Sequence, residues 1–134
     1  MMSIIQISVY AMPGVPKEPN DIARRVIKNV FKIEPDTMLQ KTRKTEVRFP
    51  RQLAVTLIFC SGVSCSKTGW MYRIDHATVL HSKDKITEIL ETKFPKEDYN
   101  KVISAIQEYK TYFPNIDLTD LPGPWNEEIL SLEQ

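Results

Sequence analysis

The residues from Arg73 to Ile86 carry the side chains whose types and spacing best suit a binding chemistry. Asp75 is a good helix N-cap, and helical periodicity follows it. Three small or polar side chains, those of Asp75, His76 and Thr78, therefore crowd the start of a predicted helix. A recognition helix places such groups against base edges in the major groove of DNA. The pattern favours the reading of double-stranded DNA over catalysis.

Positive charge is concentrated in the central third of the chain, although the net charge is only +1. Residues 1–90 carry 14 Lys and Arg against 8 Asp and Glu, a net of +6, whereas residues 91–134 carry 4 against 9, a net of −5. Within residues 41–85 the count is 9 against 3. This asymmetry predicts a polyanionic partner for the central part. A solvated basic face on an ordinary protein would give the same count.

Several classes of protein are disfavoured by composition and motifs. The spacing of Cys60 and Cys65 fits neither a zinc site nor a CxxC motif, so two free thiols in a reducing cytosol are expected. No apolar run reaches the roughly 18 residues of a membrane span, and residues 1–15 lack the basic start of a signal peptide. No phosphate-binding loop is present, so no nucleotide is expected. The predicted location is the cytoplasm, in association with the nucleoid.

Apolar residues at helical spacing predict an all-α fold of about five helices. The expected helices cover residues 20–33, 50–60, 65–71, 75–92 and 96–112. The run 50–60 is nearly all apolar, as a buried strand would also be. A helix is preferred there because Pro50 suits the first turn of a helix and because helices flank the run.

Capping residues and helix breakers set the expected helix ends. The first helix is expected to begin at Asn20 or Asp21, the third at Ser64 and the last after Pro95, while Gly62 ends the second. Residues 73 and 74 would form the turn before the fourth helix.

The segments between the helices are expected to be irregular. Residues 3–11 fit a strand or a loose arm, residues 36–39 a single turn and residues 40–49 an exposed basic loop. Residues 114–124 are expected to form a Pro- and Gly-containing loop. The acidic tail 125–134 fits one or two helical turns or disorder.

The two last helices are expected to be amphipathic. In 75–92, one face carries Val79, Ser82, Ile86, Ile89 and Leu90, and the opposite face carries Ala77, His81, Asp84 and Glu88. The apolar stripe of 96–112 is an expected core face, and a dimer face would have the same pattern.

Three separated blocks of sequence resemble one known family. Asp-His-Ala-Thr-Val-Leu-His at 75–81, followed by Lys85-Ile86, resembles the signature of domain IV, the C-terminal DNA-binding domain, of the bacterial chromosomal replication initiator DnaA. This domain belongs to the Trp-repressor-like helix-turn-helix superfamily. Pro-Arg-Gln at 50–52, with the apolar helix after it, resembles a second block of that family, and residues 22–40 resemble its first helix and the turn that follows.

The resemblance implies a division of the chain and a function. It covers about residues 20–92 as a helix-turn-helix domain, preceded by an arm at 1–19 and followed by a helical extension with an acidic tail at 93–134. The implied function is sequence-preferring binding of double-stranded DNA at sites like the DnaA box, in replication or its regulation. No enzyme activity and no cofactor are implied.

The candidate DNA-binding residues are Arg43, Lys44, Arg48, Arg51, Gln52, Asp75, His76, Ala77, Thr78 and His81. By resemblance, residues 75–78 face bases in the major groove, Arg43 enters the minor groove and Arg51 contacts a phosphate. An Asp carboxylate accepts from a cytosine amino group, and a small methyl group such as that of Ala77 suits a thymine methyl. His81 would reach a phosphate or sugar. Lys41 and the other basic residues of 41–51 would release counterions from DNA.

This sequence departs from the family at several positions. Ala77 stands where the family has Thr, Arg73-Ile74 replaces Gly-Gly-Arg, Phe59 replaces a lysine, and Thr45-Glu46 lies in the basic loop. These changes bear on the identity and affinity of the DNA site more than on the docking mode.

Other roles for the same residues are less favoured. His76 and His81 would point about 140° apart on a helix, which disfavours a shared metal site. Cys60 with His81 would make a nucleophile pair only if Cys60 left its apolar run. The main rival is a protein-interaction module on a DnaA-like scaffold that modulates a replication or transcription protein. In that case the acidic residues 91–134 would dock a replication protein or cover the basic face.

Overall fold

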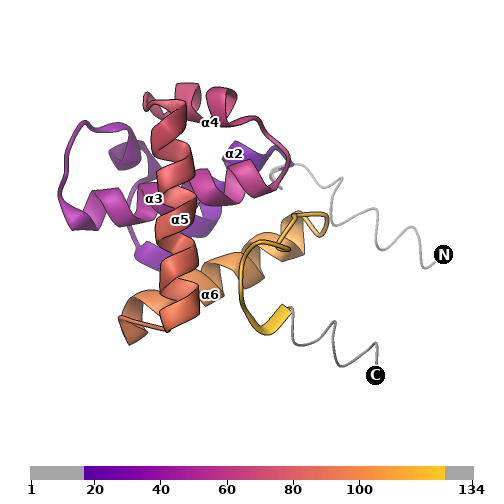
Figure 1. Cartoon of the computed structure of the whole chain (residues 1–134). Helices are drawn as coiled ribbons and strands as arrows, with labels where there is room; N and C mark the ends of the chain where they lie inside the picture. Colours follow the sequence, from indigo (N-terminus) through magenta and orange to yellow (C-terminus); the bar gives the residue numbers. More distant parts are fainter. Residues whose placement is uncertain (1–16, 126–134) are drawn as a thin grey trace.

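The computed structural model describes residues 17–125, which form an all-α fold in which no strand occurs (Figure 1). Its elements are α2 (Pro19–Phe31), the 3₁₀ helix η1 (Pro35–Leu39), α3 (Thr45–Cys60), α4 (Cys65–Tyr72), α5 (His76–Thr92) and α6 (Lys96–Tyr112). The expected strand or arm at 3–11 and all but the first residue of the acidic tail lie outside the described residues. None of the helices in the described part is long and apolar enough to cross a lipid bilayer.

The core is built around α3, whose residues 53–58 are all fully buried. A nearly all-apolar helix must lie in the middle of a bundle, because no side of it can face water at low cost. In Figure 1, α5 crosses in front of α3, and α4 lies at the end where α5 begins. The apolar stripe of α6 packs into the same core through Val102, Ile106 and Tyr109, so it is a core face.

The helix α3 begins earlier than the sequence indicated. Residues 45–49 were expected in a loop, but α3 starts at Thr45, and Pro50 is its sixth residue rather than a member of its first turn. Pro50 has no N–H to bond to the carbonyl of Glu46, so the helix lacks one hydrogen bond there. Burial of Val47, Phe49 and Pro50 offsets that loss, and the Phe49 ring meets Phe31 edge-on at 5.4 Å.

The start of α2 also differs from expectation. Its N-cap is Glu18, which makes no capping hydrogen bond with its side chain, and Pro19 occupies the first turn. Asn20, an expected cap, instead accepts a hydrogen bond from the hydroxyl of Tyr72 at 2.8 Å. This bond links α2 to the end of α4. The Asn20 side chain, which local propensity assigned to an N-cap, therefore makes a long-range hydrogen bond instead.

The segment after α6 folds back onto the bundle. Four of its residues are buried: Ile116, Leu118, Leu121 and Trp125. The Asp117 N–H donates to the Cys60 carbonyl at 2.9 Å, and Asp120 pairs with Lys83 of α5 at 3.0 Å. The expected loop at 114–124 is therefore irregular but well packed, and Trp125 belongs to the core rather than to a separate tail.

Candidate nucleic-acid interface

The helices α4 and α5 are joined by a tight turn that requires a glycine. A Cβ atom added to Gly69 would lie 2.6 Å from the Ile74 carbonyl oxygen, which is far inside contact distance. The Ile74 N–H donates to the Gly69 carbonyl at 2.9 Å, and Arg73 adopts the left-handed conformation at φ 58°. As expected, Ser64 caps α4, accepting from the Lys67 N–H at 3.1 Å. These contacts make a helix-turn-helix.

The start of α5 is capped as the sequence predicted. A carboxylate oxygen of Asp75, Oδ1, accepts from the Ala77 N–H at 3.3 Å and lies 3.0 Å from Nδ1 of His76. The other oxygen, Oδ2, has no partner among the described residues, and the Asp75 side chain is 67% exposed. The cap therefore leaves one acceptor directed at solvent.

The exposed face of α5 carries every candidate residue that the sequence placed on this helix. Those residues are Asp75, His76, Ala77, Thr78 and His81, and all of them are exposed. Val79, which lies between them in the sequence, and Ser82, which follows His81, are buried, as the helical periodicity predicted. The buried Ser82 hydroxyl donates to the Thr78 carbonyl at 2.8 Å. The polar start of α5 thus faces outward on a helix that is anchored from behind.

A short basic loop lies beside this helix start, and Arg51 holds its backbone in place. From α3, the Arg51 guanidinium donates to the carbonyl oxygens of Met38 at 3.3 Å, Gln40 at 2.9 Å and Thr42 at 3.1 Å. The next residue in the loop, Arg43, is exposed. Burial, with a smaller contribution from the charge of Arg48, lowers the pKa of Arg51. The three hydrogen bonds occupy both terminal nitrogens of the Arg51 guanidinium, Nη1 and Nη2.

The basic loop and the helix-turn-helix meet at one hollow. Its volume is about 310 Å³, and it is lined by Leu39, Gln40, Lys41, Thr42, Arg43, Arg51, Tyr72, Arg73 and Ile74. Four cationic side chains thus line the surface between the 40–44 loop and the turn that precedes α5. Arg43 and Arg51 share this hollow rather than lying on opposite sides of the molecule. In an anion-binding surface this clustering raises the local positive potential.

A model of the bacterial DnaA protein helix-turn-helix family matches residues 19–86, which are about half of the chain. The chain belongs to this family. The resemblance inferred from residues 50–52 and 75–86 is therefore confirmed, and so is the all-α helix-turn-helix fold. The family is a DNA-binding domain and not a catalytic one.

One curated relative is the chromosomal replication initiator protein DnaA of Deinococcus deserti. It is 36% identical over 84 residues, which are 62% of this chain and 18% of that protein. The chain therefore spans less than a fifth of the length of this relative.

The remaining candidates of the DnaA-like domain lie around α3. Lys44 precedes the helix and Arg48 lies in its first turns, and both are exposed, whereas Gln52 is half-buried beside Arg51. The structure brings Arg43 and Arg51 to the hollow and leaves Lys44 and Arg48 outside its lining. From the sequence, Arg73 was expected only to form part of the turn before α5. Nothing in the spacing of residues 41–51 indicates that Arg73 would lie across a hollow from them.

Alternative chemistries find no support in the described part of this DnaA-like domain. No cluster of three metal-ligating side chains occurs among residues 17–125. Cys60 is buried, and desolvation raises the pKa of its thiol to about 11 despite the nearby Lys83. A thiol of that kind is a poor nucleophile at neutral pH.

Proposed function

We propose that this protein binds double-stranded DNA with sequence preference, at sites like the DnaA box, and acts in replication initiation or its regulation. The helix α5 enters the major groove with its N-terminal end, and the 40–44 loop reaches the adjacent minor groove or backbone. The binding uses no cofactor or nucleotide. The complex belongs with the nucleoid of a bacterial cytoplasm.

The arrangement of two exposed elements around one basic hollow carries this proposal. The loop of Arg43 lines this hollow together with Arg73 and Ile74, which directly precede the polar start of α5. A duplex presents a major groove and a neighbouring minor groove across one phosphate backbone, so a helix and an arginine-bearing loop can engage both. The cations between the two elements would face that backbone.

Base reading is assigned to the first turn of α5. The unpartnered Oδ2 of Asp75 can accept from a cytosine amino group, and the methyl groups of Ala77 and Thr78 can contact a thymine methyl. His76 lies beside Asp75, where its ring can reach a base edge or fix the carboxylate. His81 lies further along the exposed face and would meet sugar or phosphate.

Phosphate binding is assigned to Lys41, Lys44 and Arg48, which are exposed, while the exposed Arg43 of the same loop reaches the minor groove. The phosphate contact expected of Arg51 is revised, because its outer nitrogens already bind three carbonyl oxygens. We assign Arg51 the indirect role of positioning the loop that presents Arg43. Gln52 would assist from the same helical turn.

Fluorescence anisotropy with labelled duplexes tests the proposal. The full chain should bind a duplex carrying a DnaA box more tightly than a scrambled duplex of equal length. Arg43→Ala should weaken binding about tenfold and flatten the dependence on salt. Lys96→Ala provides a matched control, because Lys96 is exposed at the start of α6. Equal affinity for both duplexes, or no binding at low salt, would contradict the proposal.

A further inference from the structure

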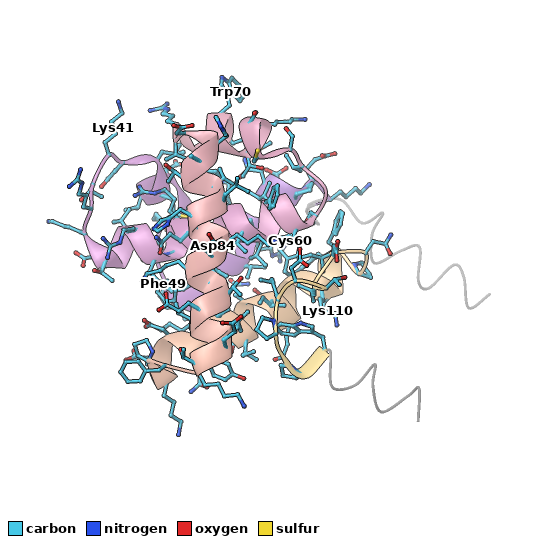
Figure 2. The ribbon with its side chains drawn as sticks, viewed as in Figure 1. Lys41, Phe49, Cys60, Trp70, Asp84 and Lys110 are labelled. Carbon is cyan, nitrogen blue, oxygen red and sulfur yellow. The ribbon has the colours of Figure 1, made fainter. Side chains whose placement is uncertain are left out.

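Trp70 of α4 presents most of its indole ring to solvent. Its exposed fraction is 81%, whereas Trp125 is 5% exposed and packs in the core. Figure 2 shows Trp70 projecting away from the bundle beyond α4. An exposed tryptophan is unusual, since burial of its large apolar surface is favourable, and such side chains are enriched at binding surfaces.

The surroundings of Trp70 are cationic. No Asp or Glu occurs between Glu46 and Asp75 in the sequence. Lys67 lies three residues before Trp70 on the same side of α4, and Arg73 lies three residues after it. Lys67 and Arg73 are both exposed. This charge pattern favours an anionic partner over an apolar protein surface.

The surface of Trp70 is continuous with the basic hollow. An open hollow of about 560 Å³ is lined by Gly69, Trp70, Met71, Arg73 and Ile74. Arg73 and Ile74 also line the hollow that contains Lys41 and Arg43. In Figure 2, Trp70 projects from the end of the molecule where α4 lies, and Lys41 projects from the loop at the upper left. A partner that spans the basic hollow would reach Trp70 by way of Arg73.

We propose that Trp70 and Arg73 form a second contact zone with the DNA backbone, outside the base-reading start of α5. Arg73 pairs with a phosphate, and the indole packs against the adjoining deoxyribose. Arg73 thereby supplies a phosphate contact in place of Arg51, whose guanidinium is engaged with three backbone carbonyl oxygens. In helix-turn-helix complexes the first helix crosses the backbone, which is where α4 would place these two side chains. This inference rests on the proposed function.

Contacts to sugar and phosphate carry no base information. The zone therefore adds affinity equally on every sequence, in contrast to the side chains of residues 75–78. This difference separates the second contact zone from the base-reading helix in an experiment.

Intrinsic fluorescence tests the contact directly, because Trp70 is the exposed one of the two tryptophans. Addition of a DnaA-box or scrambled duplex to the full chain should change the emission of Trp70. Trp70→Phe should remove that change while it leaves most of the affinity, since a phenyl ring can still pack on a sugar. Trp70→Ala should weaken binding roughly fivefold on both duplexes.

Arg73→Gly tests the phosphate contact without adding strain, because glycine adopts the left-handed conformation of this position readily. It should weaken binding roughly fivefold on both duplexes and reduce the salt slope by about one. Thermal melting of each variant, compared with that of the wild type, verifies that the fold is intact.

The inference is wrong if the wild type binds duplex with unchanged tryptophan emission while Trp70→Ala and Arg73→Gly bind as tightly as it does. That outcome leaves the proposed function in place, since Arg43→Ala would still weaken binding. Failure of the proposed function has a different signature, namely equal binding of box and scrambled duplexes.

Discussion

Arg51 donates a hydrogen bond from Nη2 to the carbonyl oxygen of Thr42, the residue directly before Arg43, at 3.1 Å. Two further bonds from Nη1 reach Gln40 and Met38. One guanidinium thus fixes the course of the loop that carries the minor-groove candidate. These hydrogen bonds explain why Arg51 is half-buried, whereas the nearby basic residues Arg43, Lys44 and Arg48 are exposed.

Replacement of Arg51 by Ala should destabilise the fold by about 1–2 kcal/mol, because three carbonyl oxygens lose a charged donor. Arg51→Lys should recover little of this loss, since an ammonium cannot reproduce the planar fork. Urea unfolding measures the free energy. The control is Arg48→Ala, which should change the free energy of unfolding little. Arg48 is exposed, and its charge disfavours the charged form of Arg51. Equal losses in the two Ala variants would refute the bracing role of Arg51.

Gly69→Ala should destabilise the protein by about 2 kcal/mol and weaken DNA binding, because the new methyl group would collide with the Ile74 carbonyl. Helix propensity alone predicts the opposite sign, a gain of about 1 kcal/mol for Ala over Gly within α4. Chemical denaturation of the variant therefore distinguishes the two effects. Gly62→Ala is the comparison, since it meets no neighbouring atom and is disfavoured only by its φ of 98°. A stabilised Gly69→Ala would show that the turn is not close-packed.

Lys93→Gly should stabilise the protein by about 0.5–1 kcal/mol. Lys93 ends α5 in the left-handed conformation with φ 57°, which costs less for glycine than for any residue with a Cβ atom. It lies at the opposite end of α5 from Asp75, so affinity for duplex should not change. The melting temperature and anisotropy of the same sample provide the two readouts. An unchanged or lower melting temperature would be inconsistent with this account of the helix end.

Stability should fall as the pH rises from about 9 towards 11 because of Cys60. Burial raises the pKa of its thiol from 9.0 to about 11. Below pH 9 the thiol is largely neutral in both states, whereas above it the unfolded state loses the proton first and is thereby stabilised relative to the folded state. The expected loss at pH 10 is about 1 kcal/mol. Urea unfolding under reducing conditions should show a smaller loss in Cys60→Ala, and parallel losses in the two proteins would assign the effect to other groups.

The caps of α4 and α5 were predictable because their signals are local. Ser64 and Asp75 cap α4 and α5 as their positions before apolar periodic runs indicated. The alternation of buried Val79 and Ser82 with exposed neighbours follows from the helical repeat alone. The family blocks then placed the exposed side chains of α5 on a recognition helix.

The features that were not predicted depend on contacts between residues that are distant in the sequence. Pro50 has a strong local preference for a first turn, yet burial of Val47 and Phe49 extends α3 past it. The engagement of Arg51 with loop carbonyls, and the hollow that joins Arg73 to Arg43, depend on how α3, the loop and the turn pack together. Packing also determines that Leu121 and Trp125 belong to the core. No spacing rule in one sequence contains that information.

The most direct test of base reading is the affinity of His76→Ala for the DnaA-box duplex and the scrambled duplex, measured side by side with the wild type at one salt concentration. The account predicts that His76→Ala loses about tenfold on the box duplex and little on the scrambled one, so that discrimination largely disappears. The same loss on both duplexes would contradict the assignment of the α5 start to base recognition.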